Sequence, residues 1–80
     1  MTFDYVKQAV VDDYNDFYFE YNGVNCGVEI DGDLSKFNLL YGDDIQKVDG
    51  DFDAAVRVPF FGGRSVLDIF DSVADSIRFV

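Results

Sequence analysis

The chain lacks histidine altogether and has a single cysteine among its 80 residues. Without histidine it has neither the usual general base near neutral pH nor the commonest nitrogen ligand of zinc, so Ser-His and Cys-His nucleophile pairs are excluded. Its one cysteine, Cys26, cannot form an internal disulfide, which is typical of a reducing compartment. The sequence therefore predicts no enzymatic activity, no catalytic residue, no cofactor and no metal ion.

Basic residues are also scarce, since six Lys and Arg stand against sixteen Asp and Glu and leave a net charge of −10. Such a field repels phosphate backbones and anionic lipid head groups, which disfavours direct binding of nucleic acid or of a membrane surface. The same field attracts basic surfaces. We therefore expect a protein partner with a basic surface.

No segment approaches the ~18 apolar residues of a membrane span, and the first residues do not resemble a signal peptide. A cytoplasmic location is expected. Hydrophobic residues make up 49% of the chain, and nine Phe and five Tyr supply material for one core. A chain of this length forms one domain, residues 1–80, with too little depth for a catalytic cleft.

Apolar residues recur with a helical period near the start of the chain. Phe3, Val6, Val10 and Tyr14 form one stripe, which predicts a helix capped by Thr2 and ending near Asn15.

Two alternating runs, residues 17–21 and 24–30, flank Asn22-Gly23, the strongest short signal for a β-hairpin. The predicted register pairs Tyr21 with Val24, Phe19 with Cys26 and Phe17 with Val28. Residues 36–41 alternate again, and a four-residue loop would set Phe37 opposite Val28, Leu39 opposite Cys26 and Tyr41 opposite Val24. This register also places Lys36 beside Glu29 and Tyr18 beside Gly27.

The second half of the chain predicts a short edge strand at residues 45–48, a helical turn at residues 53–56 that ends before Pro59, and a final helix. The buried stripe of that helix is Val66, Ile69, Phe70, Val73 and Ile77. Ser65 and Asp68 form a capping box, and Arg78 suits the helix C-terminus. The predicted fold class is α+β, with an N-terminal helix, a meander of three or four antiparallel strands and a C-terminal helix, the helices packing on one sheet face.

Three local motifs have some features of ligand sites. Asp49, Asp51 and Asp53 begin a calcium loop, but Ala54 and Phe60 stand where an EF-hand needs Gly and Glu. The segment 62–65, Gly-Gly-Arg-Ser, resembles the end of a phosphate loop, although a turn before a capped helix accounts for all four residues. Cys26 lies on the apolar face of its strand, as a buried core residue would.

The outward face of the predicted sheet is the candidate binding surface. Tyr18 and Leu40 stand there among acidic residues, although one polar, solvated face is also ordinary for an antiparallel sheet. The predicted partner-binding residues are Asp16, Tyr18, Glu20, Glu29, Asn38 and Leu40.

With Gly23, the segment 60–70 (Phe-Phe-Gly-Gly-Arg-Ser-Val-Leu-Asp-Ile-Phe) and the acidic balance in view, the chain resembles small uncharacterised acidic proteins of Gram-positive bacteria, their phages and mobile elements. Those proteins have a Gly-Lys-Ser-Leu-type helix start, which Arg64 and Val66 alter here, and the family has no settled function, so the resemblance implies no functional residue. In architecture and charge the chain also resembles acidic anti-CRISPR proteins, which implies carboxylates presented in place of DNA phosphates. Double-stranded RNA-binding domains share a similar element order but have a basic surface.

Three hypotheses follow. The leading one is an acidic protein-binding module that mimics nucleic acid and inhibits a basic, nucleic-acid-handling protein. The second is a structural domain that forms a homodimer through Tyr18, Leu40 and the strand edges. The third is a calcium-responsive module built on Asp49, Asp51 and Asp53.

Overall fold

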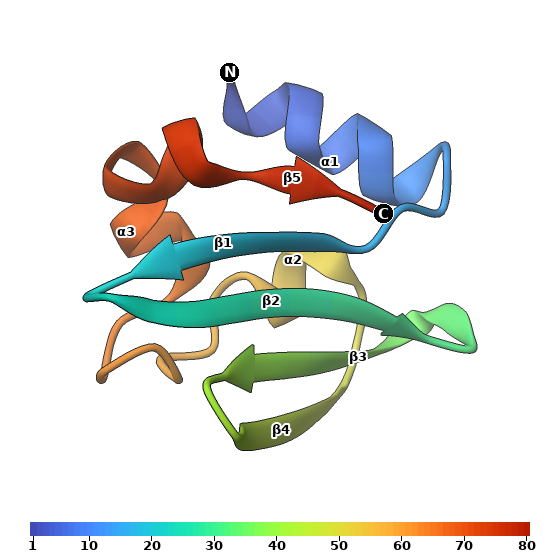
Figure 1. The fold of residues 1–80 in the computed structure, drawn as a ribbon. Helices are drawn as coiled ribbons and strands as arrows, with labels where there is room; N and C mark the ends of the chain where they lie inside the picture. Colours follow the sequence, from blue (N-terminus) through green and yellow to red (C-terminus); the bar gives the residue numbers. More distant parts are fainter.

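Five antiparallel strands and three α-helices form the fold in the computed structural model, which describes all 80 residues (Figure 1). The helices are α1 (Phe3–Val11), α2 (Phe52–Ala55) and α3 (Val66–Val73), and a 3₁₀ turn, η1 (Ala74–Ser76), follows α3. The strands are β1 (Phe17–Tyr21), β2 (Val24–Asp31), β3 (Asp33–Tyr41), β4 (Asp44–Asp49) and β5 (Arg78–Phe79), in the sheet order β4-β3-β2-β1-β5. The predicted α+β class is confirmed, with five strands instead of three or four.

The helices pack on one face of this sheet and enclose a single hydrophobic core. Sixteen buried residues form one cluster, to which all three helices and the three central strands contribute. Apolar residues alternate along the strands, so burying one face leaves the other to solvent. The core residues are Val6, Val10, Phe17, Phe19, Cys26, Val28, Phe37, Leu39, Phe52, Ala55, Val56, Phe61, Val66, Ile69, Phe70 and Val73.

The first hairpin has the predicted register. Tyr21 pairs with Val24 across a two-residue turn, and the pairing continues to the far end of β1. Asn22 (φ 55°) and Gly23 (φ 72°) both adopt positive φ, as a type I′ turn requires. The local Asn-Gly signal therefore determines the side-chain alternation of both strands.

The predicted register between the second and third strands is wrong by two residues. Val28 pairs with Leu39 instead of Phe37, so Glu29 lies opposite Asn38 and the expected pairing of Glu29 with Lys36 does not form. Six residues instead of four separate the last regular pair, Ile30 and Phe37, because the strands shift register after Ile30 and Asp31 pairs with Asp33 around Gly32. Within this irregular stretch the Asp33 carboxylate accepts a hydrogen bond from the Ser35 amide (2.8 Å). A shift of two residues keeps every side chain on its predicted face.

The first helix ends earlier than the apolar stripe suggests. It stops at Val11, and Tyr14 lies in the left-handed region (φ 57°) with its side chain exposed. The Tyr14 amide donates a hydrogen bond to the Val10 carbonyl and the Asn15 amide donates one to the Ala9 carbonyl, and these two bonds end the helix. The prediction that Tyr14 belongs to the apolar stripe of this helix is therefore wrong, whereas the Thr2 cap is confirmed by a 3.1 Å hydrogen bond from the Tyr5 amide.

The chain after α3 returns to the sheet, which the sequence did not predict. The capping box of Ser65 and Asp68 is present, but the helix ends at Val73 and Arg78 lies in β5 instead of at a helix terminus. Phe79 pairs with Phe17, and residues 16 and 80 exchange backbone hydrogen bonds. Ile77 and Phe79 alternate as strand residues do. The pairing of β5 with β1 takes the place of the last helical turn that the apolar period predicted.

The segment between β4 and α3 follows its prediction with shifted bounds. The edge strand extends by one residue at each end beyond residues 45–48. The helical turn begins at Phe52 instead of Asp53, because the Asp51 carboxylate caps it by accepting the Ala54 amide (2.9 Å) and Phe52 is buried in the core.

Candidate functional site

The six predicted binding residues are placed together on the solvent-facing side of the sheet. Tyr18, Gly27 and Leu40 are consecutive in register across β1, β2 and β3, and Glu29 lies opposite Asn38. Glu20 is exposed, and the other predicted residues are half-buried. Their common face follows from the strand alternation, which the two-residue register error leaves intact.

An apolar row crosses the middle of this face and is longer than the sequence suggested. Ile45 of β4 lies opposite Leu40 and extends the row to the edge of the sheet, where its side chain is 62% exposed. At the other end Arg78 of β5 pairs with Tyr18. We call the residues Ile45, Leu40, Gly27, Tyr18 and Arg78 the central row.

Sequence reasoning missed both ends of the central row. Ile45 was predictable, because the turn at Gly42 (φ 59°) and Asp43 sets Leu40 opposite it. Arg78 was not predictable in this way, since its place depends on a strand at the other end of the chain.

Tyr18 contacts three other residues of this face. Its ring covers Gly27, where a Cβ atom would lie 2.5 Å from Cδ1 of Tyr18, and the Arg78 guanidinium lies 5.8 Å from the ring centroid. Its hydroxyl donates a 2.5 Å hydrogen bond to the Glu29 carboxylate. That bond, together with burial and the negative charges of Glu29 and Asp16, raises the pKa of Tyr18 from 10.0 to about 12.

This raised pKa predicts a loss of stability at alkaline pH. The folded protein holds the Tyr18 proton more tightly than the unfolded chain does, so the contribution is complete below pH 10.0 and disappears as the pH rises to about 12. We expect spectrophotometric titration to show one tyrosine with a pKa near 12, and Glu29→Ala to move it back toward 10. Tyr18→Phe should remove that titration, and its persistence in Tyr18→Phe would show that the assignment is wrong.

The carboxylates beside the central row have different roles. The Asp16 carboxylate accepts a hydrogen bond from the Ile30 amide (2.8 Å), which links the segment before β1 to the end of β2. Glu29 is engaged by Tyr18, whereas Glu20 contributes only its backbone amide to a hydrogen bond, with the Ser76 hydroxyl (2.9 Å). Glu20 therefore presents an uncompensated negative charge to solvent beside the row.

The three aspartates of the suggested calcium loop are held apart. Asp49 lies opposite Lys36 in the β3–β4 ladder, Asp51 caps α2, and Asp53 forms an ion pair with Lys7 (3.1 Å). No group of three or more carboxylate or cysteine side chains gathers with the spacing of a metal site.

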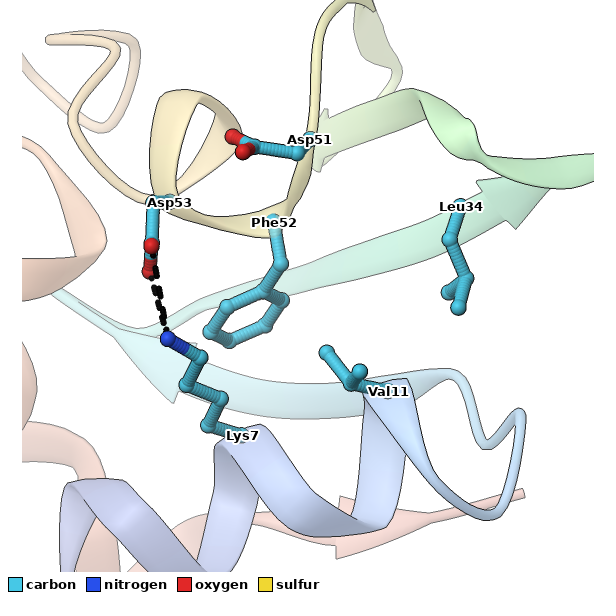
Figure 2. A pocket seen from close by; sticks show the side chains of 6 residues that line it. All are labelled: Lys7, Val11, Leu34, Asp51, Phe52 and Asp53. Atoms are coloured by element: carbon cyan, nitrogen blue, oxygen red, sulfur yellow. Dashed lines mark hydrogen bonds and ion pairs between the residues drawn. The ribbon is translucent and has the colours of Figure 1, made fainter.

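Figure 2 shows the hollow of about 230 Å³ where Lys7 meets Asp53. Phe52, Val11 and Leu34 form its apolar wall. Both charged side chains are about half exposed, so the ion pair adds little stability. Its three charged side chains are already engaged, Lys7 with Asp53 and Asp51 with the Ala54 amide, so the hollow carries no argument for a ligand site.

The remaining motifs have structural roles. Burial raises the pKa of the Cys26 thiol to about 11, which agrees with its interpretation as a core residue. Phe61 and Arg64 exchange two backbone hydrogen bonds across a turn in which Gly62 and Gly63 have positive φ. Ser65 then caps α3, so a turn and a cap account for the whole segment.

No helix of this structure has the length and apolar character needed to cross a membrane. Comparisons of this chain with protein-family models, curated proteins and solved structures found no match.

Proposed function

We propose that this protein is an acidic binding module whose uncovered sheet face docks on a basic surface of a protein partner. The observation that carries the proposal is the central row, in which Ile45, Leu40 and Tyr18 cross the sheet without a helix over them. An apolar row rimmed by polar groups is typical of a protein-binding surface. Glu20 and Glu29 supply charge on either side of it.

The net charge supports a basic partner. A surplus of ten negative charges accelerates encounter with positive surfaces and repels phosphates and acidic head groups. The commonest basic surfaces in a cell belong to proteins that handle nucleic acid. In this proposal the module acts in the cytoplasm as a nucleic-acid mimic and inhibits such a protein by occupying its basic groove.

The open outer edge of β4 favours one alternative, which is self-association through sheet edges and the central row. In that case the mass measured by light scattering would double as the protein concentration rises. A constant monomer mass is the result expected for the binding module.

Affinity capture from a lysate tests the proposal with a matched pair of charge reversals. Glu20→Lys with Glu29→Lys changes the net charge from −10 to −6 on the open face, and Asp12→Lys with Asp71→Lys makes the same change among exposed helix-side residues. We expect a basic protein that is released by salt, at least about tenfold weaker capture by the face variant, and near-normal capture by the helix-side variant. Equal weakening by both variants would show that only net charge matters, and capture of no basic protein would refute the proposal.

A further inference from the structure

The two edge strands of the sheet differ in their length and in what lies beside them. At one edge β5 has only two residues, and α1 lies along it in Figure 1. The ring centroid of Tyr5, in α1, is 6.1 Å from that of Phe79, in β5. At the other edge β4 extends over six residues, and no element lies beyond it. Only the β4 edge therefore has room for another strand.

The phase of the β3–β4 ladder determines which backbone groups of β4 are unpaired. The two-residue turn closes on Tyr41 and Asp44, which form a hydrogen-bonded pair, and such pairs then alternate along the hairpin. The bond from the Gly50 amide to the Ser35 carbonyl (2.8 Å) agrees with this phase. The N–H and C=O groups of Ile45 and Lys47 consequently point away from the sheet.

The side chains of this edge distinguish its two faces. Ile45 is exposed on the open face and continues the central row, whereas Asp44 is exposed on the opposite face beside Asp43 of the turn. The one cation of the strand, Lys47, is turned back over the sheet, with Nζ 3.6 Å from the Asp31 carboxylate and 3.5 Å from the Asn38 amide oxygen. The edge therefore offers unpaired backbone groups, the apolar side chain of Ile45 on the open face, and exposed carboxylates on both faces, Asp49 on the open face and Asp44 on the other.

We propose that the β4 edge receives an extended, basic segment of the partner as a sixth strand of the sheet. This inference rests on the proposed function and gives its partner a defined chemistry. Strand addition supplies backbone hydrogen bonds, and alternate side chains of the added strand lie on opposite faces. Apolar residues of the segment lie beside Ile45, and its Lys or Arg residues lie on the other face near Asp43 and Asp44.

The net charge of the chain favours a basic segment over a second copy of this chain as the strand added at the β4 edge. Two copies joined edge to edge would bring two net charges of −10 together, whereas a basic strand neutralises the carboxylates at the edge. Charged residues on an exposed edge strand are a common means by which proteins avoid pairing with themselves.

The test uses a fluorescent peptide, acetyl-Lys-Val-Lys-Val-Lys-Val-Lys-amide, whose dissociation constant is measured at low ionic strength. Lys47→Pro removes the outward N–H and leaves the groups paired with β3 in place, while Lys47→Ala removes the side chain only. We expect Lys47→Pro to weaken binding about tenfold and Lys47→Ala to change it by less than about threefold. Melting temperatures of both variants show whether the fold is intact.

A second measurement leaves the protein unchanged and alters the peptide. We expect the segment to add antiparallel to β4, so that a valine directly opposite Ile45 exchanges both backbone hydrogen bonds with it, and methylating the valine nitrogens should abolish binding. Methylating the lysine amides should leave the dissociation constant within about threefold. Equal effects of the two peptides, or no binding of the unmethylated peptide, would overturn the inference even if Lys47→Pro fails to fold.

Failure of this inference is distinguishable from failure of the proposed function. If the peptide binds equally well to Lys47→Pro but not to the Glu20→Lys, Glu29→Lys variant, the edge is not the site and face binding stands. If Lys47→Pro abolishes peptide binding while the face variant captures the partner normally, strand addition at β4 is supported and docking through the open sheet face is refuted. A chain that dimerises alone and becomes monomeric with Lys47→Pro would place a second copy at the edge and overturn the inference.

Discussion

Phe61→Ala is expected to lower the free energy of unfolding by about 3–5 kcal/mol. The Phe61 side chain is fully buried, and its ring centroid lies 5.3 Å from that of Phe19 and 5.5 Å from that of Phe60. Truncation leaves a cavity between the turn that follows Pro59 and the sheet, and the surrounding rings can fill it only in part. Because an 80-residue domain has a total stability of about 4–12 kcal/mol, the variant should be close to unfolded.

Urea denaturation followed by circular dichroism measures this effect. Ile45→Ala is the matched control, since it also truncates a large apolar side chain but at an exposed position, where a change within about 0.5 kcal/mol is expected. A loss below about 1 kcal/mol for Phe61→Ala would show that the segment around residue 61 is not part of the cooperative core.

The parts of the fold that the sequence predicted are those specified by neighbouring residues. Asn22-Gly23 allows only a turn whose two residues both have positive φ, and this fixes the pairing of β1 with β2. Ser65 and Asp68 satisfy each other's backbone amides, so the start of α3 is also local information. Neither feature needs a contact with a distant part of the chain.

The predictions that were wrong concern residues whose pairing depends on distant segments of the chain. Ile77 and Arg78 continue a helical pattern, yet Arg78 pairs with β1, about 60 residues away, and no local signal indicates that partner. The bulge after Ile30 likewise depends on how the start of β3 is shared between β2 and β4, where Lys36 pairs with Asp49. A period-two pattern assigns the face of a side chain but does not identify its neighbour.

The candidate site was predictable to the same extent. Alternation placed Tyr18, Glu29 and Leu40 on one face, and the register error of two residues did not change that. The specific contacts were not predictable, because the bond from Tyr18 to Glu29 and the contact of Tyr18 with Arg78 require the final register and β5.

Gly27→Ala is expected to destabilise the protein by about 1–3 kcal/mol and to disrupt the central row. The added Cβ would lie 2.5 Å from Cδ1 and 2.9 Å from Cε1 of Tyr18, distances that real Cβ atoms do not adopt, so the ring must leave the sheet. Displacing it breaks the hydrogen bond to Glu29 and the contact with Arg78. The pKa of Tyr18 should therefore fall from about 12 toward 10 in the same variant.

A double-mutant cycle separates this clash from a general intolerance of alanine in β2. In a Tyr18→Ala background the atom nearest to the added Cβ is Leu40 Cδ1, at 3.1 Å, and this end of a flexible side chain can move. Alanine also loses less backbone entropy than glycine on folding, which is worth about 0.5–1 kcal/mol. Gly27→Ala should then be neutral or stabilising, so its effect changes sign with the residue at position 18. An equal loss of stability in both backgrounds would mean that the ring of Tyr18 does not rest on Gly27, and the central row would lose the residue around which it is organised.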